Sequence, residues 1–123
     1  MKTLYVFITN KIKEVTENVG FTHVSKQSTF PYVTYKHTTA NAIQDEIEDV
    51  IIEIDIWNKE REGVDFISEI EDITSQIKKR LKNERYCNES YFYMFQLIGN
   101  LNIQDEDETI HRRQLRFRVR KYN

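Results

Sequence analysis

Hydrophobic and polar residues alternate most clearly between positions 46 and 57. One face of an extended chain would carry four aliphatic residues here, namely Val50, Ile52, Ile54 and Ile56. The other face would carry a mixed set, namely Ile51, Glu53, Asp55 and Trp57. A period of two is typical of a β-strand with one face toward the core. The pattern therefore predicts a strand over residues 46–57 with two carboxylates on its second face.

Three further segments also predict strands. Residues 32–37 are rich in β-branched and aromatic side chains, and they follow Pro31, which cannot donate to a strand ladder. Residues 91–103 form a longer apolar segment that we expect to bend near Gly99. Residues 109–122 alternate again, with inward Leu115, Phe117 and Val119 and outward Arg116, Arg118 and Arg120. Residues 38–44 are predicted to form a turn or loop.

Apolar residues at helical spacing mark two other segments. Residues 2–18 have this spacing, and Gly20 follows as a residue that can end a helix in the left-handed conformation. In residues 64–82 one stripe collects the apolar side chains Phe66, Ile67, Ile70, Ile73, Ile77 and Leu81. Acidic residues concentrate in the first half of this segment and basic residues at its end, which complements the helix dipole. Residues 21–31 are predicted to connect the first helix to the first strand.

The predicted order of elements is α-β-β-α-β-β. We expect an α+β fold in which a four-stranded, mainly antiparallel sheet has two helices packed on one face. The length of 123 residues suits a single domain that spans residues 1–123. The longest apolar run is far shorter than a membrane span, so no membrane partner is expected. The single cysteine, Cys87, excludes an internal disulfide and fits a reducing cytoplasm.

The net charge of −2 hides an uneven distribution. Residues 44–74 hold twelve acidic and two basic side chains, whereas the last fifteen residues hold five arginines and a lysine. These two regions can neutralise each other within one fold or between subunits.

The carboxylates of Glu53 and Asp55 allow two interpretations. They are two residues apart on one strand face, so together they could bind Mg²⁺ as in a metal-dependent nuclease. They could instead pair with Arg116 or Arg118 on a neighbouring strand, because opposite charges across a sheet stabilise it. We favour pairing, within or between subunits, since the arginines have the right charge and the right period.

The arginines near the C-terminus could also form a nucleic-acid patch. The relevant side chains are Arg112, Arg113, Arg116, Arg118 and Arg120. Nucleic-acid-binding modules usually carry a net positive charge, which this chain lacks. A solvated or acid-paired strand face is therefore the favoured interpretation.

Residues 91–98 would present apolar side chains on both faces of a strand, so both faces need cover. One face would meet the helices. The other could meet a second subunit, or it could be covered within the same domain. We predict a subunit interface that joins this strand to the mixed face of residues 46–57 and to the arginine-bearing face of residues 109–122. Its residues are Ile51, Glu53, Asp55, Trp57, Tyr93, Arg116, Arg118 and Arg120.

Common catalytic signatures are missing from the sequence. It contains no Gly-rich phosphate loop, no serine elbow, no Cys/His nucleophile pair and no His or Cys group at metal-ligand spacing. We therefore expect no enzyme activity, no catalytic residues, no bound metal and no cofactor.

Several segments together resemble the tail terminator (tail completion) proteins of long-tailed bacteriophages and prophages. The features are Pro31-Tyr32-Val33-Thr34-Tyr35, Ile52-Glu53-Ile54-Asp55-Ile56-Trp57, the helix through Ile67, Ile70 and Ile77, and Leu115-Arg116-Phe117-Arg118-Val119. The resemblance covers residues 30–122 and an amphipathic N-terminal helix. These are signals of fold and pattern rather than of catalysis.

The resemblance implies a minor tail protein that assembles in the host bacterial cytoplasm. Such a protein forms a ring, typically a hexamer, at the head-proximal end of the virion tail. The ring caps the tail tube, stops polymerisation of the major tail tube protein, and provides the surface that joins the tail to the connector proteins of the head. DNA is then only passing cargo in the lumen. We expect the acidic strand and helix of one copy to meet the arginine strand of the next.

Three alternatives remain open at this point. A head–tail connector or neck protein shares the small size and the ring assembly. A metal-dependent nuclease would use Glu53 and Asp55. A host regulatory domain would dimerise through its sheet.

Overall fold

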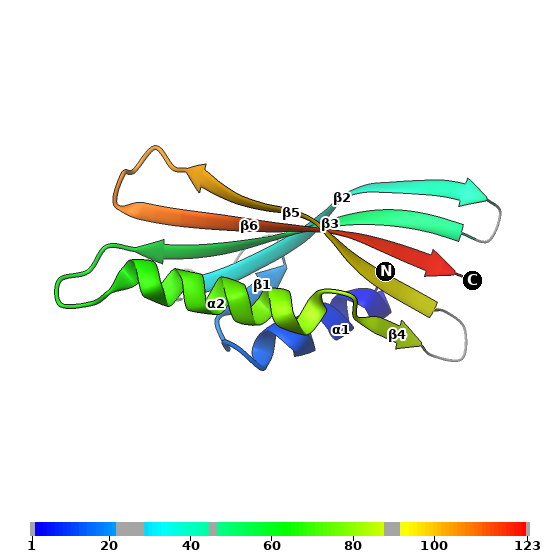
Figure 1. The fold of residues 1–123 in the computed structure, drawn as a ribbon, viewed down its shortest axis with the longest axis horizontal. Coiled ribbons are helices and arrows are strands. Elements are labelled where there is room, and N and C mark those ends of the chain that lie inside the picture. Colours follow the sequence, from blue (N-terminus) through cyan, green and yellow to red (C-terminus); the bar gives the residue numbers. More distant parts are fainter. Residues whose placement is uncertain (1, 22–28, 45–46, 88–91, 123) are drawn as a thin grey trace.

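The computed structural model describes residues 2–21, 29–44, 47–87 and 92–122. Two helices and six strands follow one another along this part of the chain (Figure 1), in the order α1 (Lys2–Lys13), β1 (Val19–Phe21), β2 (Tyr32–Gln44), β3 (Ile47–Lys59), α2 (Phe66–Leu81), β4 (Arg85–Cys87), β5 (Phe92–Gln104) and β6 (Ile110–Tyr122). The strands form one sheet in the order β1-β2-β3-β6-β5-β4.

The sheet differs from the predicted one, although the α+β class holds. The prediction of four strands in a mainly antiparallel sheet is wrong, because the sheet has six strands and is mixed. Strand β1 runs parallel to β2, while the other neighbours are antiparallel. The long strands are twisted, as β-strands usually are, and the sheet curls into a half-barrel (Figure 1).

The missed strands are short and lie at the sheet edges. Strands β1 and β4 have three residues each, which is too few to show a period of two. Gly20, predicted to stop the first helix, lies in β1, and α1 ends earlier, at Lys13. Residues 22–28 of the predicted connection 21–31 lie outside the described part of the chain. The first residues of two predicted strands, Glu46 and Tyr91, also lie outside it.

Strand β2 is about twice as long as predicted, so the loop predicted at residues 38–44 is wrong. The pairing with β3 continues to Gln44, but its register shifts between His37 and Thr39 and again between Ala42 and Gln44. Each such bulge places an extra residue in one strand and interrupts the alternation of side chains. The sequence pattern therefore loses its period of two where the strand continues. A shift between Leu97 and Gly99 of β5 coincides with the predicted bend.

Both helices lie on the same side of the sheet (Figure 1). The core between these layers contains Leu4, Ile8 and Ile12 of α1, Ile70, Ile77 and Leu81 of α2, and the inward residues of the strands. Every second residue of β3 from Val50 to Ile56 is at most 1% exposed. The predicted core faces of β3 and β6 are therefore confirmed.

A buried asparagine fixes the start of α2 to the end of β3. The Asn58 side chain is fully buried, and its Nδ2 donates to the carbonyl oxygen of Phe66 at 2.9 Å and to Glu69 Oε1 at 3.0 Å. Its Oδ1 accepts from the backbone N–H of Lys59 at 3.0 Å. Burial of an amide requires such partners. This residue therefore sets the position of α2 over the sheet.

The N-cap of α2 offers a first test of the fold. The Asp65 carboxylate accepts from the backbone N–H of Ser68 at 3.1 Å and from its hydroxyl at 2.8 Å, and these bonds lower the pKa of Asp65 below its ordinary value of 3.8. Since the folded pKa is lowered, the contribution to stability is present above the unfolded pKa and is lost as pH falls through the folded value. We expect Asp65→Ala to lower the melting temperature at pH 7, and we expect the difference from the wild type to shrink as the pH falls below 3.8 and through the lowered pKa of folded Asp65.

Thermal unfolding followed by circular dichroism at a series of pH values measures this difference. Asp65→Asn is the control, because asparagine caps helices without a titrating group. A difference between wild type and Asp65→Ala that stays constant at every pH below 3.8 at which the protein is still folded would contradict the assignment.

Candidate functional site

The side of the sheet that faces away from the helices carries two adjacent rows of opposite charge. Strands β3 and β6 are antiparallel neighbours, and the register places Asp49 opposite Arg120, Glu53 opposite Arg116, and Asp55 opposite Gln114. We call this surface the charged face and define it by Asp49, Glu53 and Asp55 of β3 together with Arg112, Gln114, Arg116, Arg118 and Arg120 of β6.

One end of the charged face is largely buried. The Asp55 side chain is 5% exposed and its Oδ1 accepts from Arg112 Nε at 2.9 Å and from Gln114 Nε2 at 3.1 Å. The Arg112 guanidinium also lies over the Trp57 ring, 4.6 Å from its centroid, and Trp57 Nε1 donates to Thr34 Oγ1 at 3.1 Å. These contacts connect the side chains of β2, β3 and β6 on this side of the sheet.

The other end pairs carboxylates with more exposed arginines. Arg116 Nη2 donates to Glu53 Oε1 at 3.0 Å. Arg120 donates to both oxygens of Asp49, at 2.9 and 3.2 Å, in the forked geometry that suits a guanidinium. The hydrogen bonds from Arg120 to Asp49, and then the charge of that carboxylate, raise the pKa of Arg120 above its ordinary value. Arg118 Nε is farther from Asp49 Oδ2, at 3.8 Å.

Exposure within these pairs is unequal. The side chains of Arg116, Arg118 and Arg120 are 43, 43 and 42% exposed, whereas those of Glu53 and Asp49 are 12 and 16% exposed. Solvent and partners therefore meet guanidinium groups first, with the carboxylates beneath them. This half of the charged face presents a basic surface although the chain as a whole carries a net charge of −2.

Apolar residues of β5 border the arginines. The register places Met94 beside Arg120 and Leu101 beside Gln114, so both belong to the side away from the helices. Leu101 is 46% exposed, and Ile98, which follows the inward Leu97, is 39% exposed. Strongly exposed aliphatic side chains next to arginines are typical of protein–protein contact surfaces.

Seven of the eight predicted interface residues share this side of the sheet. They are Ile51, Glu53, Asp55, Trp57, Arg116, Arg118 and Arg120. Tyr93 differs, because it lies on the helix side of β5, is fully buried and stacks on Tyr86. A side chain buried in the core of one chain offers no surface to a second one.

The sequence interpretation omitted three members of the charged face, Asp49, Arg112 and Gln114, from the interface. Extending the period of two would have found them, because odd positions from 49 to 57 and even positions from 112 to 120 share this side. The expected pairing of Glu53 and Asp55 with arginines is confirmed within one chain. The partners are Arg116 for Glu53 and Arg112 for Asp55, rather than Arg118.

This pairing bears on two of the earlier expectations. The acidic strand lies beside the arginine strand of its own chain, so Asp49, Glu53 and Asp55 of β3 already have arginine partners within the chain. The same bonds involve Glu53 Oε1 and Asp55 Oδ1, which are two of the oxygens that a nuclease would use for Mg²⁺. Among the residues that the structure describes, no group of three or more His, Cys, Asp or Glu side chains is arranged to hold a metal ion.

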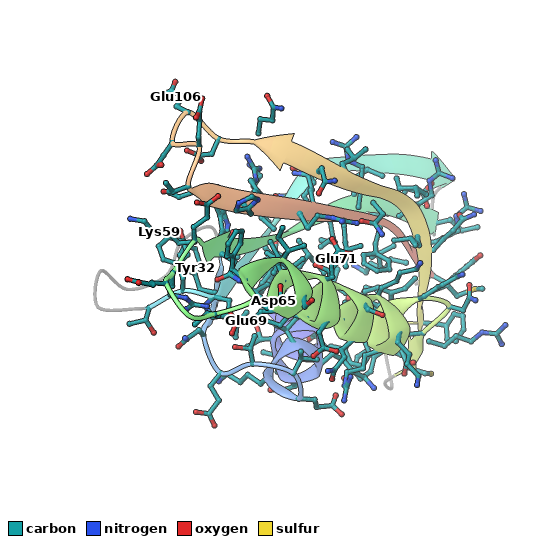
Figure 2. The ribbon with its side chains drawn as sticks, turned by 60° about the vertical axis from the view of Figure 1, so that its left-hand side comes forward. Tyr32, Lys59, Asp65, Glu69, Glu71 and Glu106 are labelled. Carbon is teal, nitrogen blue, oxygen red and sulfur yellow. The ribbon has the colours of Figure 1, made fainter. Side chains whose placement is uncertain are left out.

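A second surface feature lies on the other side of the sheet, between α2 and the β5–β6 hairpin. It is a cleft of about 570 Å³ whose walls include Ile67, Ile70 and Ile110. Its lining carries both charges, with Glu71 on α2, Asp105, Glu106 and Glu108 on the hairpin, and Arg112 and Arg113 on β6. Arg113 forms an ion pair with Glu71. Figure 2 shows Glu106 at the hairpin tip, directed away from the sheet, whereas Asp65, Glu69 and Glu71 lie along α2.

No helix in the described part of the chain is long and apolar enough to cross a membrane.

The described elements define a two-layer α+β protein whose free sheet face carries arginines. No protein-family model matches the chain, and no curated protein matches it either. Its fold is similar to that of a chain in a solved structure described as "Virion of native gene transfer agent (GTA) particle". The TM-score is 0.66 at 10% sequence identity, and the match covers 91% of this chain and 84% of the other. At this identity the likeness shows a shared fold.

Proposed function

We propose that this protein is a structural component of a phage virion and that it acts as a tail terminator. In this role it caps the tail tube, stops polymerisation of the major tail tube protein, and forms the surface that joins the tail to the connector proteins of the head. It works as a ring, with six copies as the expected number, at the head-proximal end of the tail. DNA passes through the lumen as cargo.

The observation that carries the proposal is the shared fold with a virion chain. The match covers nearly all of this chain and most of the other, so it concerns the complete architecture rather than a common hairpin. The sequence resemblance to tail terminators points independently to the same class of particle. The exposed arginines and aliphatic residues of the free sheet face support a role in assembly, because such surfaces suit protein contacts.

Tube growth in vitro tests the proposal. The purified chain is added to polymerising major tail tube protein from the same phage or prophage, and tube lengths are measured by negative-stain electron microscopy. We expect shorter tubes that carry the added chain at one end, because a bound cap blocks the addition of further subunits. The added chain should also sediment with the tubes.

Connector protein from the same virion serves as the comparison in this experiment. Binding to the connector with no effect on tube length would favour the neck-protein alternative. Binding to neither protein would contradict the proposed function.

A further inference from the structure

An arginine-lined depression lies on the helix-free side of the sheet, where β5 begins and β6 ends. Its volume is about 690 Å³, and its walls include Arg85, Arg118 and Arg120. Met94 and Gln96 of β5 also line it. A hollow that combines three guanidinium groups with an apolar side chain suits a partner segment that carries carboxylates.

The charges of this depression are only partly neutralised within the chain. Arg120 is held by Asp49 through two hydrogen bonds, whereas Arg118 is 3.8 Å from the same carboxylate and 43% exposed. Arg85 of β4 is exposed. The one carboxylate in the wall, Glu84, forms an ion pair with Lys11 of α1 at 3.5 Å. Arg85 and Arg118 are therefore the groups best placed to bind an added anion.

The tip of the β5–β6 hairpin supplies carboxylates in a fixed geometry. Residues 105–108 are all acidic. Asp105 and Asp107 shape the turn through their side chains. Asp105 Oδ1 accepts from the Asp107 N–H at 3.0 Å. Asp107 Oδ1 accepts from the Thr109 N–H at 2.9 Å and from the Thr109 hydroxyl at 2.6 Å. Glu106 and Glu108 are exposed, and Figure 2 shows Glu106 projecting from the tip.

The tip and the depression of one chain cannot meet. They lie at opposite ends of β5 and β6, which have 13 residues each, and Figure 1 shows the hairpin and the C-terminus at opposite ends of the molecule. About ten residues of strand separate them, which corresponds to roughly 30–35 Å. Contact therefore requires a second copy, and it joins two different surfaces. Repetition of such a heterologous contact closes a ring when the rotation between copies permits it.

We propose that the hairpin tip of one copy, through Glu106 and Glu108, binds in the depression formed by Arg85, Arg118 and Arg120 of the next copy. The inference rests on the proposed function, because it names the contact that builds the ring. It also corrects the expectation that the acidic strand meets the arginine strand of a neighbour. The hairpin takes the place of that strand, since β3 is already paired within its own chain.

Charge reversal on each side of the contact tests the inference. The tip variant is Glu106→Arg/Glu108→Arg, the depression variant is Arg85→Glu/Arg118→Glu, and the control is Glu14→Arg/Glu17→Arg at exposed positions after α1. Light scattering coupled to size exclusion over a concentration series gives the oligomer mass. Like charges facing each other should weaken self-association of each variant about 100-fold, whereas the control should match the wild type.

Two further samples, a mixture of the two variants and a chain with all four substitutions, distinguish a lost contact from a folding defect. In an equimolar mixture of tip and depression variants, each tip meets a depression of opposite charge, so the wild-type mass should return. A single chain with all four substitutions should also self-associate. Loss in each variant with recovery in both combinations is the expected result.

Two outcomes would overturn the inference. One is a wild-type oligomer that neither variant weakens. The other is a wild-type chain that stays monomeric at every concentration, in which case the proposed function is judged separately by tube capping.

Discussion

We expect Phe117→Ala to lower the free energy of unfolding by about 3–5 kcal/mol, a large share of the stability of a domain this size. Phe117 is fully buried at the centre of the sheet, where the register sets it beside Ile52 of β3 and Leu97 of β5. Its ring also meets that of Phe95 edge-on, with 6.3 Å between the centroids. Truncation removes this contact area and leaves a cavity that neighbouring strands cannot fill.

Denaturant unfolding at pH 7 measures the loss. Phe117→Leu is the matched control, because it retains most of the volume and is expected to cost less than about 1.5 kcal/mol. If the alanine variant were as stable as the leucine variant, Phe117 would not hold the two layers together. Because the substitution removes no charged group, it should leave the arginine surface chemically intact in the molecules that remain folded.

The second large effect is expected at Asp55. Asp55→Ala should lower the free energy of unfolding by about 2–3 kcal/mol, because the carboxylate is only 5% exposed and its removal leaves Arg112 Nε without this acceptor. Gln114 Nε2 loses one of its two acceptors and keeps Glu53 Oε2. Asp55→Asn retains an acceptor oxygen and should cost less. Asp72→Ala, on the exposed side of α2, is the matched control and should change stability by about 0.5 kcal/mol or less.

The Asp55 variants also separate a structural carboxylate from a catalytic one. If Asp55 is structural, denaturant unfolding reports the main effect, and wild-type protein incubated with Mg²⁺ leaves DNA intact. A nuclease would show cleavage with Mg²⁺ that Asp55→Asn abolishes while stability stays near that of the wild type. That second pattern would contradict both the pairing role and the structural class proposed for this protein.

The arrangement of charge on the sheet connects stability with assembly. The buried end of the charged face, around Asp55 and Trp57, ties three strands together, while the other end exposes guanidinium groups over two carboxylates. Arg112 and Arg120 thus belong mainly to the fold, because their carboxylate partners hold them at hydrogen-bond distance. Arg118 and Arg85 have more freedom, and they are the residues we assign to a neighbouring copy.

Sequence periodicity was informative wherever an element is long and regular. It identified the core faces of β3 and β6, the outward direction of Arg116, Arg118 and Arg120, and part of the stripe of α2. Within that stripe Ile67 is 56% exposed, and the buried Thr74 was missed. It failed at the two edge strands, which are too short to show a period, and along the second half of β2, where bulges interrupt it. Seven residues of the expected interface share one side of the sheet, and the interface itself stays a prediction; Tyr93 lies in the core instead, because β5 is apolar on both sides.

Alternation and helical spacing are local properties of the backbone, so the order of the amino acids was enough to show which residues share a face. It was also enough for the α+β class, the two helices, the long strands β3, β5 and β6, and the first half of β2. Which strands are neighbours became known only from the fold of the whole chain. That choice depends on hydrogen bonds between segments distant in the chain and on the packing of the helices over the sheet. The tertiary fold places β3 beside β6, so the carboxylates meet arginines of the same chain. It also places the hairpin tip and the arginine-lined depression at opposite ends of the molecule.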